Sequence, residues 1–189
     1  MAPSNELDEL GRTAAGCTRC PLAATRTQVV FGVGNPDADL MFVGEAPGRD
    51  EDLQGEPFVG RSGQLLDRLV REELGLDRSQ FYIANVVKCR PPDNRDPRPE
   101  EISSCRPYLE GQLAAIDPSV VVTLGNFATK LLVGTDLGIT KVRGASYPVG
   151  GRYLVPTYHP AAALRSGGVV VAEMRADLIR AKQLLGSRP

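Results

Sequence analysis

Four short, mostly apolar segments alternate with longer segments of helical spacing, and this alternation constrains the fold more than any other feature of the chain. The apolar segments are residues 40–43, 81–87, 120–124 and 153–157. The spacing of apolar residues predicts helices over residues 5–16, 63–74, 99–116, 126–133 and 169–185. Strands that alternate with helices are typical of an α/β fold, in which helices cover both faces of a parallel sheet.

Local signals set several boundaries between these segments. Ser62 is a suitable N-cap for the helix over residues 63–74, and Gly75 is a suitable end for it. Residues 29–31 predict one further short strand. Segment 89–99 holds four prolines and three arginines, so we expect it to be a loop.

Composition is that of an ordinary globular protein. The chain has 189 residues, 42% of them hydrophobic and 24% charged, with a net charge of -1, and we expect one domain over residues 1–189. The sequence contains no apolar run of the roughly 18 to 20 residues that span a bilayer. Its polar start lacks the features of a secretory signal, so we expect a cytoplasmic protein without a membrane partner. A monomer is the default expectation for a chain of this size.

Polar side chains and glycines follow each of the four predicted strands. Glu45, Asn85, the pair 125–126 and His159 all lie at or just after a strand end. Because ligands of parallel sheets bind outside the carboxyl ends of the strands, we expect these four segments to meet on one rim. The loop after the first strand resembles a phosphate loop in its glycines, but it lacks both nucleotide-binding patterns, which disfavours a nucleotide site.

Each rim residue has a functional and a structural interpretation. A carboxylate such as Glu45 can orient and deprotonate a water molecule, and the alternative is an ordinary turn residue. Phe58 offers either a flat platform for an aromatic ring or simple core packing. The amide of Asn85 offers one acceptor and two donors, which suits the edge of a nucleobase. His159 is the only histidine, and its N–H can stabilise an oxyanion if it is not purely structural.

Four cysteines indicate a metal centre beside this rim. Cys17 and Cys20 form a C-x2-C pair, while Cys89 and Cys105 lie sixteen residues apart. Disulfides are rare in the cytoplasm, and inert buried thiols are the alternative to a metal site. The spacing leaves zinc and a [4Fe-4S] cluster open. In either case the centre would act as a staple that ties the first helix to the proline-rich loop.

Four motifs together resemble a known family. They are residues 44–48 (GEAPG), 56–66 (EPFVGRSGQLL), 85–92 (NVVKCRPP) and 159–160 (HP). This set is similar to the iron-sulfur uracil-DNA glycosylases of the family-4 type, and the four cysteines match the cluster ligands of that family. The resemblance extends from about residue 17 to residue 165.

The resemblance implies a fold and an activity. The fold is a three-layer α/β/α sandwich with a central four-stranded parallel sheet, and the cofactor is a [4Fe-4S] cluster. The activity is hydrolysis of the N-glycosidic bond of deoxyuridine in single- or double-stranded DNA, which releases free uracil and leaves an abasic site for base excision repair. The partners would then be uracil-containing DNA and uracil as product.

The same resemblance assigns roles to residues. Phe58 would stack on uracil, Asn85 would read its edge, and His159 would stabilise charge on its carbonyl. Glu45 would place the water, and the backbone of Ala46 would contact the base.

Further candidates surround the pocket or contact the DNA. Glu51 and Asn94 are candidate substrate-binding residues. Leu164 and Arg165 are candidate DNA contacts, with Leu164 as a wedge and Ala163 as the alternative wedge position.

The sequence also departs from the better-known uracil glycosylases. Those enzymes carry an aspartate and an aromatic residue where this chain has Ala46 and Gly48. The exclusion of thymine must therefore come from elsewhere, and Glu51 is the candidate.

Two other function classes compete with a glycosylase. A related branch traps uracil-DNA covalently through a histidine in a basic loop insertion, whereas this chain has residues 90–95 there and no second histidine. An iron-sulfur redox protein or a nucleotide enzyme would need a flavin or dinucleotide motif, and the sequence shows neither. A glycosylase that turns over is therefore favoured.

Overall fold

A mixed sheet of six strands lies at the centre of residues 3–189, which are the residues that the computed structural model describes. The strands are β1 (Val33–Gly34), β2 (Leu40–Gly44), β3 (Tyr82–Asn85), β4 (Val120–Leu124), β5 (Tyr147–Val149) and β6 (Arg152–Thr157). Their order is β1-β3-β2-β4-β6-β5. The central four strands are parallel, and β1 and β5 pair antiparallel at the two edges. The predicted parallel centre is confirmed, and the sheet is two short edge strands wider than expected.

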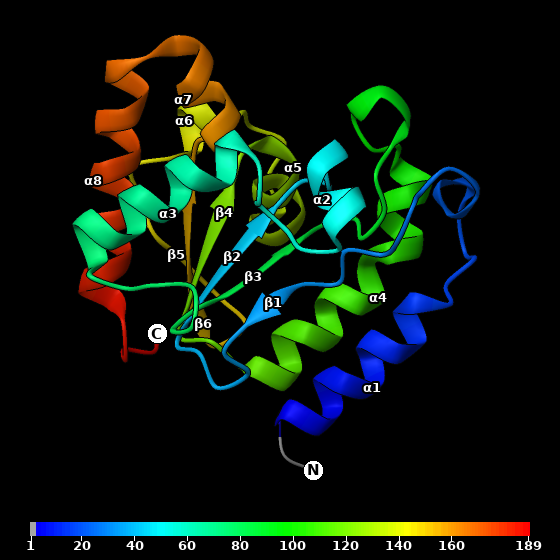
Figure 1. The fold of residues 1–189 in the computed structure, drawn as a ribbon. Helices are drawn as coiled ribbons and strands as arrows, with labels where there is room; N and C mark the ends of the chain where they lie inside the picture. Colours follow the sequence, from blue (N-terminus) through cyan, green and yellow to red (C-terminus); the bar gives the residue numbers. More distant parts are fainter. Residues whose placement is uncertain (1–2) are drawn as a thin grey trace.

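Helices form a layer on each side of the sheet, as the α/β prediction requires (Figure 1). Helices α1 (Pro3–Ala15) and α4 (Pro99–Ile116) lie together on one side, and α3 (Arg61–Leu74) and α8 (Gly168–Leu184) on the other. The shorter helices are η1 (Pro21–Ala24), α2 (Arg49–Gln54), η2 (Pro92–Asn94), α5 (Asn126–Thr129), η3 (Lys130–Gly134), α6 (Ile139–Val142) and α7 (Pro160–Ser166). Within residues 3–189, every helix is too short or too polar to cross a membrane.

Alternating side chains of the strands divide the core into two clusters. In β2, Met41 and Val43 belong to the cluster on the α1 and α4 side, whereas Leu40 and Phe42 belong to the cluster on the α3 and α8 side. All four side chains are at most 1% exposed. Continuous burial explains why this strand is apolar at every position instead of alternating.

Two local predictions are wrong for identifiable reasons. The strand expected over residues 29–31 is absent from the described structure, and pairing begins instead at Val33, beyond a glycine at 32 with φ of 145°. Helix α3 starts at Arg61 and its N-cap is Gly60, not Ser62. The amide of Gly60 donates to the Glu51 carboxylate at 3.0 Å, which fixes the start of the helix earlier than its own sequence indicates. The predicted end at Gly75 is confirmed by its left-handed φ of 73°.

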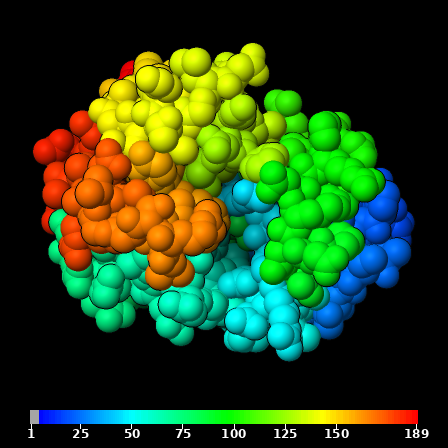
Figure 2. Space-filling model, turned by 90° about the horizontal axis from the view of Figure 1, so that it is seen from above, coloured from blue at the N-terminus to red at the C-terminus, as the bar shows by residue number. Residues whose placement is uncertain are grey.

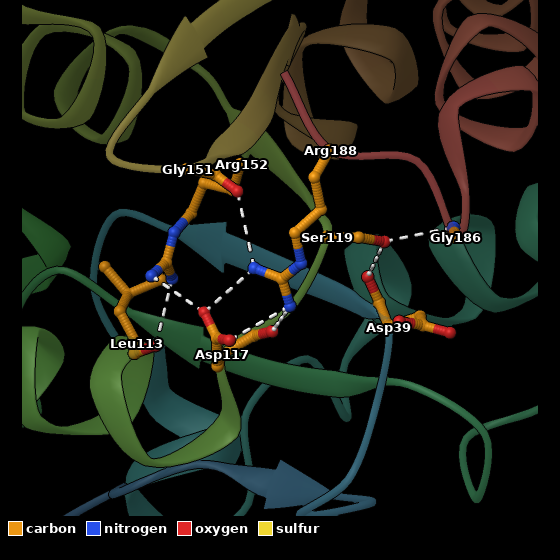
Figure 3. Close-up of polar contacts among 8 residues, drawn as sticks. All are labelled: Asp39, Leu113, Asp117, Ser119, Gly151, Arg152, Gly186 and Arg188. Atoms are coloured by element: carbon orange, nitrogen blue, oxygen red, sulfur yellow. Dashed lines mark hydrogen bonds and ion pairs between the residues drawn. The ribbon is translucent and has the colours of Figure 1, made fainter.

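A polar network lies at the amino ends of the parallel strands (Figure 3). The carboxyl ends of β2, β3, β4 and β6 lie at the other end of the sheet. Asp117 follows α4, and its Oδ1 accepts hydrogen bonds from the guanidinium groups of Arg152 at 3.4 Å and Arg188 at 3.1 Å. Arg188 also donates to the Asp117 carbonyl at 2.8 Å. The network thereby anchors the segment after α8 to the start of β6.

A buried ion pair fixes α8 against the end of α6. The guanidinium of Arg143 donates to both carboxylate oxygens of Asp177, at 2.9 and 3.1 Å, and to Glu173 at 3.0 Å. The Asp177 side chain is fully buried, and Arg180 lies 3.7 Å from it. Removal of one partner leaves the other charge buried without compensation.

We predict that Arg143→Met lowers the free energy of unfolding by about 3 kcal/mol, because the Asp177 carboxylate then keeps only the longer contact to Arg180. Arg106→Met is the matched control, since Arg106 pairs with Glu110 at 2.7 Å on the exposed surface of α4. The control should lose about 0.5 kcal/mol or less. Urea unfolding of both variants measures the difference, and equal losses would contradict the assignment.

Candidate functional site

A groove of about 870 Å³ lies at the carboxyl ends of the parallel strands. Figure 2 looks down on this end of the molecule and shows the surface hollowed between the loop after β2, residues 88–98, α5 and α7. Glu45, Asn85, Gly125 and His159 all line it. The four segments that the sequence predicts on one rim therefore do meet there.

One wall of the groove is made of two rings. The rings of Phe58 and His159 lie with their centroids 5.6 Å apart and tilted by 31°. Phe58 is 6% exposed and has a left-handed φ of 56°, which is uncommon for an aromatic residue. Arg78 holds this conformation by donating to the carbonyls of Pro57, at 2.8 Å, and of Phe58. Phe58 thus packs into the core and also presents part of its ring to the groove.

Gly44 allows the Phe58 ring and the Asn85 amide to approach each other. A Cβ at position 44 would lie 2.4 Å from Oδ1 of Asn85 and 2.5 Å from Cζ of Phe58. Both distances are far below van der Waals contact, so a side chain at this position would displace one of the two groups. The end of β2 therefore requires a glycine for packing, not for backbone conformation.

Asn85 carries an unsatisfied acceptor. Its side chain is 1% exposed, and Oδ1 has no hydrogen-bond partner among the described residues. A buried carbonyl oxygen without a donor costs about 1 to 3 kcal/mol, so such groups need an explanation. Because Asn85 lines the groove, a donor on a bound ligand would satisfy this oxygen.

His159 is held in one protonation state. Burial lowers its pKa to about 4, and the nearby charge of Arg165 acts in the same direction, whereas Glu51 opposes it. Nδ1 accepts a hydrogen bond from the amide of Ala161 at 3.1 Å. A neutral imidazole that accepts at Nδ1 carries its proton on Nε2. His159 is therefore a neutral Nε2–H donor.

The pKa of Glu45 is in the range expected of a general base. Burial raises its pKa to about 7, and the neighbouring negative charge of Asp96 contributes in the same direction. A carboxyl group with a pKa near neutrality can both accept and release a proton under physiological conditions. The residue stands at the end of β2, where the backbone carbonyl of Glu45 accepts from the amide of Val87 at 3.1 Å.

The carboxylate of Glu51 connects two loops. One oxygen accepts from the amides of Val59 and Gly60, both at 3.0 Å, and the other accepts from Gly48 at 3.1 Å. The side chain lines the groove, but its oxygens are already engaged with backbone groups. Its geometry is that of a residue that positions the loops carrying Glu45 and Phe58.

The remaining predicted residues lie in or near the groove. Ala46 and Asn94 line it, and Oδ1 of Asn94 accepts from Arg90 at 2.7 Å. Arg165 also lines it. Leu164 is 42% exposed on α7, whereas Ala163 is 3% exposed within the core. Of the two predicted wedge positions, Leu164 is therefore the exposed one.

The four cysteines line a second, smaller cavity. Cys17 and Cys20 follow α1, Cys89 follows β3, and Cys105 lies on α4. The amide of Lys88 donates to Sγ of Cys105 at 3.2 Å. Arg26 donates to Sγ of Cys89 at 3.5 Å and to the carbonyl of Cys17 at 2.7 Å.

The four thiols are the residues that could hold a metal centre. Within residues 3–189, no group of three or more His, Cys, Asp or Glu side chains is already arranged to hold a metal ion. Two of the four thiols around the cavity accept N–H hydrogen bonds, and in an iron-sulfur cluster such bonds to sulfur help to set the reduction potential.

Comparison with known families agrees with this geometry. Residues 31–179 match the model of the Uracil DNA glycosylase superfamily. The chain belongs to this superfamily. Three similar relatives carry the name Type-4 uracil-DNA glycosylase. The protein of Sulfurisphaera tokodaii is 48% identical over 85% of this chain and 76% of its own. That of Archaeoglobus fulgidus is 49% identical over 84% and 83%, and that of Thermotoga maritima is 51% identical over 79% of both chains.

Sequence reasoning missed several residues that shape the site of this glycosylase-superfamily member. Asp96 acts on Glu45, Arg78 holds the Phe58 loop, and Lys88 lies between the groove and the cysteines. The signal for Asp96 was its place in a proline-rich loop beside the rim. Arg78 and Lys88 act on backbone carbonyls, and the sequence gives no signal for such contacts.

We predict that Glu51→Ala separates the two loops of this glycosylase-superfamily site. Three backbone amides lose their acceptor, so hydrogen exchange at Val59 and Gly60 should accelerate at least about tenfold, and stability should fall by about 2 kcal/mol. The control is Glu56→Ala, because Glu56 is exposed on the same loop. Unchanged exchange at both amides in the Glu51 variant would contradict the role.

Proposed function

We propose that this protein is a type-4 uracil-DNA glycosylase that hydrolyses the N-glycosidic bond of deoxyuridine in DNA and releases free uracil. The observation that carries the proposal is the unsatisfied Oδ1 of Asn85 beside the rings of Phe58 and His159. The relatives that share most of the chain and bear this name support it.

Base recognition follows from the shape of the pocket. The ring of Phe58 would stack on the base, and Asn85 would face its edge. Uracil presents N3–H and O4 there, so one amide matches both, with Oδ1 accepting and Nδ2 donating. Cytosine presents an acceptor and a donor in the reverse order, so the same held amide would leave two polar groups unpaired.

Bond cleavage requires stabilisation of a departing anion. As the bond between C1′ and N1 breaks, its electron pair goes to the base and the deoxyribose becomes cation-like. The neutral Nε2–H of His159 would donate to the uracil carbonyl on which the negative charge develops. A neutral donor gains most when charge appears in the transition state, because it binds the uncharged carbonyl of the substrate less strongly.

Water completes the reaction with the help of Glu45. An ionised Glu45 would orient one water molecule toward C1′ and accept its proton as the new C–O bond forms. Ala46 also lines the groove, and its backbone would contact the base. The carboxyl group releases its proton to solvent and the departing uracil anion takes one up, so the products are an abasic site and uracil.

DNA would lie across the groove with the target base turned out of the stack. Extrusion costs a few kcal/mol in a duplex and less in a single strand, so both would be substrates. Arg165 would contact the backbone, and the exposed Leu164 would occupy the space that the base leaves. Asn94, held by Arg90 at 2.7 Å, would line the DNA side of the pocket.

The alternative is a protein that traps uracil-DNA instead of turning over. Trapping of that kind uses a histidine beyond the one at the strand end, and the sequence contains one histidine in all. Turnover is favoured for this reason.

We further propose that Cys17, Cys20, Cys89 and Cys105 hold a [4Fe-4S] cluster. The four thiols around one cavity support a metal centre, and the resemblance to the iron-sulfur uracil-DNA glycosylases favours a cluster over zinc. The cluster would serve as a structural staple between the segment after α1, the loop after β3 and α4. The chemistry at uracil needs no electron transfer.

The proposed activity is tested with a labelled oligonucleotide that contains one uracil. Incubation followed by alkali should cleave the strand at the uracil, in both single- and double-stranded form, and a matched thymine strand should stay intact. The His159→Ala variant should be slower by about 100- to 1,000-fold, because one oxyanion donor is lost. Its melting temperature and its affinity for undamaged DNA serve as controls and should not change. If the uracil strand stays uncleaved after incubation with the unmodified protein and alkali, the proposal is wrong.

Activity should depend on pH through one ionisation. Glu45 accepts a proton only when ionised, and its pKa is about 7, so kcat/KM should rise with pH to a plateau above 7. Below 7 it should fall about tenfold per pH unit. The pKa of His159, about 4, keeps that ring neutral over this range. Asp96→Asn should move the inflection to lower pH because it removes a like charge. The control Asp93→Asn, on the same loop, should leave the pH of the inflection unchanged. A shift of the inflection in the control but not in Asp96→Asn would refute the Glu45 assignment.

The cysteine centre predicts colour and iron. The protein purified without oxygen should show broad visible absorption and about four iron atoms per chain. Cys105→Ser should lose both, whereas Ser104→Ala, a neighbour that lines the same cavity, should keep both. A colourless protein with one zinc ion per chain would overturn the cluster assignment.

A further inference from the structure

Lys88 is a buried cation between the groove and the cysteine centre. Its side chain is 1% exposed. Nζ donates to the backbone carbonyl of Asn85 at 2.8 Å and to Oε1 of Gln112 at 2.5 Å, and it lies 5.8 Å from the centre of the Phe31 ring. None of these contacts belongs to the reaction described above.

The carbonyl that Lys88 holds lies where the sheet ends. Edge strand β1 pairs with β3 only at Tyr82 and Ile83, so it does not extend to Asn85. On the other side, β2 reaches Asn85 through Gly44, its last residue. The ammonium group therefore supplies a hydrogen bond to Asn85 beyond the reach of the edge strand.

The backbone of Lys88 faces the other centre. Its amide donates to Sγ of Cys105 at 3.2 Å, and its carbonyl accepts from the amide of Val30 at 2.8 Å. The next residue is Cys89. Lys88 thus contacts both Asn85, at the end of β3, and Cys105, a proposed cluster ligand.

An ammonium in this position is costly for stability alone. Taking a charge out of water has a penalty of several kcal/mol, and an apolar side chain of similar volume is often as stable in such a place. The hydrogen-bond partners of Nζ are neutral oxygens, and the charge of a Cys105 thiolate offsets only part of this cost. A role in positioning explains why a lysine is present.

We propose that Lys88 is a positioning residue that fixes Asn85 for the recognition of uracil and connects that amide mechanically to the cysteine centre. The inference rests on the proposed glycosylase function and adds a residue to its substrate specificity. It concerns binding of the base, not the step at C1′.

The test measures inhibition by free uracil in the oligonucleotide assay. Lys88→Met keeps the volume of the side chain and the backbone donor to Cys105 but removes Nζ. We expect the inhibition constant for uracil to rise about tenfold, because the amide of Asn85 loses its fixed position. Affinity for undamaged DNA, iron content and visible absorption should stay as in the unmodified protein. A purely structural role would instead lower stability and DNA affinity together.

Tyr82→Phe is the matched control. Its hydroxyl accepts from Nε2 of Gln112 at 3.3 Å in the same buried network but does not touch Asn85, so uracil inhibition should not change. Gln112→Leu is the second variant, for use if Lys88→Met does not fold, and it should weaken uracil inhibition because it removes one acceptor that orients Nζ.

The outcomes separate this inference from the proposed function. An unchanged uracil inhibition constant in a folded Lys88→Met protein, or in Gln112→Leu if the first does not fold, would overturn the role of Lys88. Failure of the unmodified protein to release uracil would overturn the proposed function itself.

Discussion

The parallel pairing of β3, β2, β4 and β6 is the constraint on which the site depends. Parallel strands have their carboxyl ends on the same side of the sheet, so the residues that follow them are brought together although they lie more than a hundred positions apart in the chain. Glu45 and His159 come to one groove for this reason. The buried cores on both faces of the sheet fix the register, since a slip by one residue would exchange the two clusters of side chains.

Charged side chains that bind backbone groups give the loops of the site their shape. Glu51 accepts from three amides, and Arg78 donates to two successive carbonyls. Glu101, whose side chain is fully buried, accepts both a fork from Arg95 and the amide of Arg98. Loops without regular structure have many unpaired backbone groups, and these long polar side chains satisfy them locally. The site is therefore preorganised by contacts that involve no substrate.

The sequence predicted the fold and the set of site segments well, because both depend on local pattern. The limits of α4 and β4 followed from a proline at a helix start and from a continuous apolar run. The edge strands β1 and β5 were missed, since two or three residues carry too little periodicity. The start of α3 was misplaced because Glu51, nine residues away in the chain, holds Gly60. Contacts of this kind depend on tertiary structure, and a linear pattern contains no trace of them.

The polar network around Asp117 has a practical consequence. It anchors the segment that contains Arg188 to the starts of the strands, while the groove opens at their ends. A fluorophore or a surface linker attached beside this network would thus sit on the far side of the sheet from the groove. Immobilised molecules could then present an unobstructed groove to solution, which suits single-molecule tests of the proposed activity on long DNA.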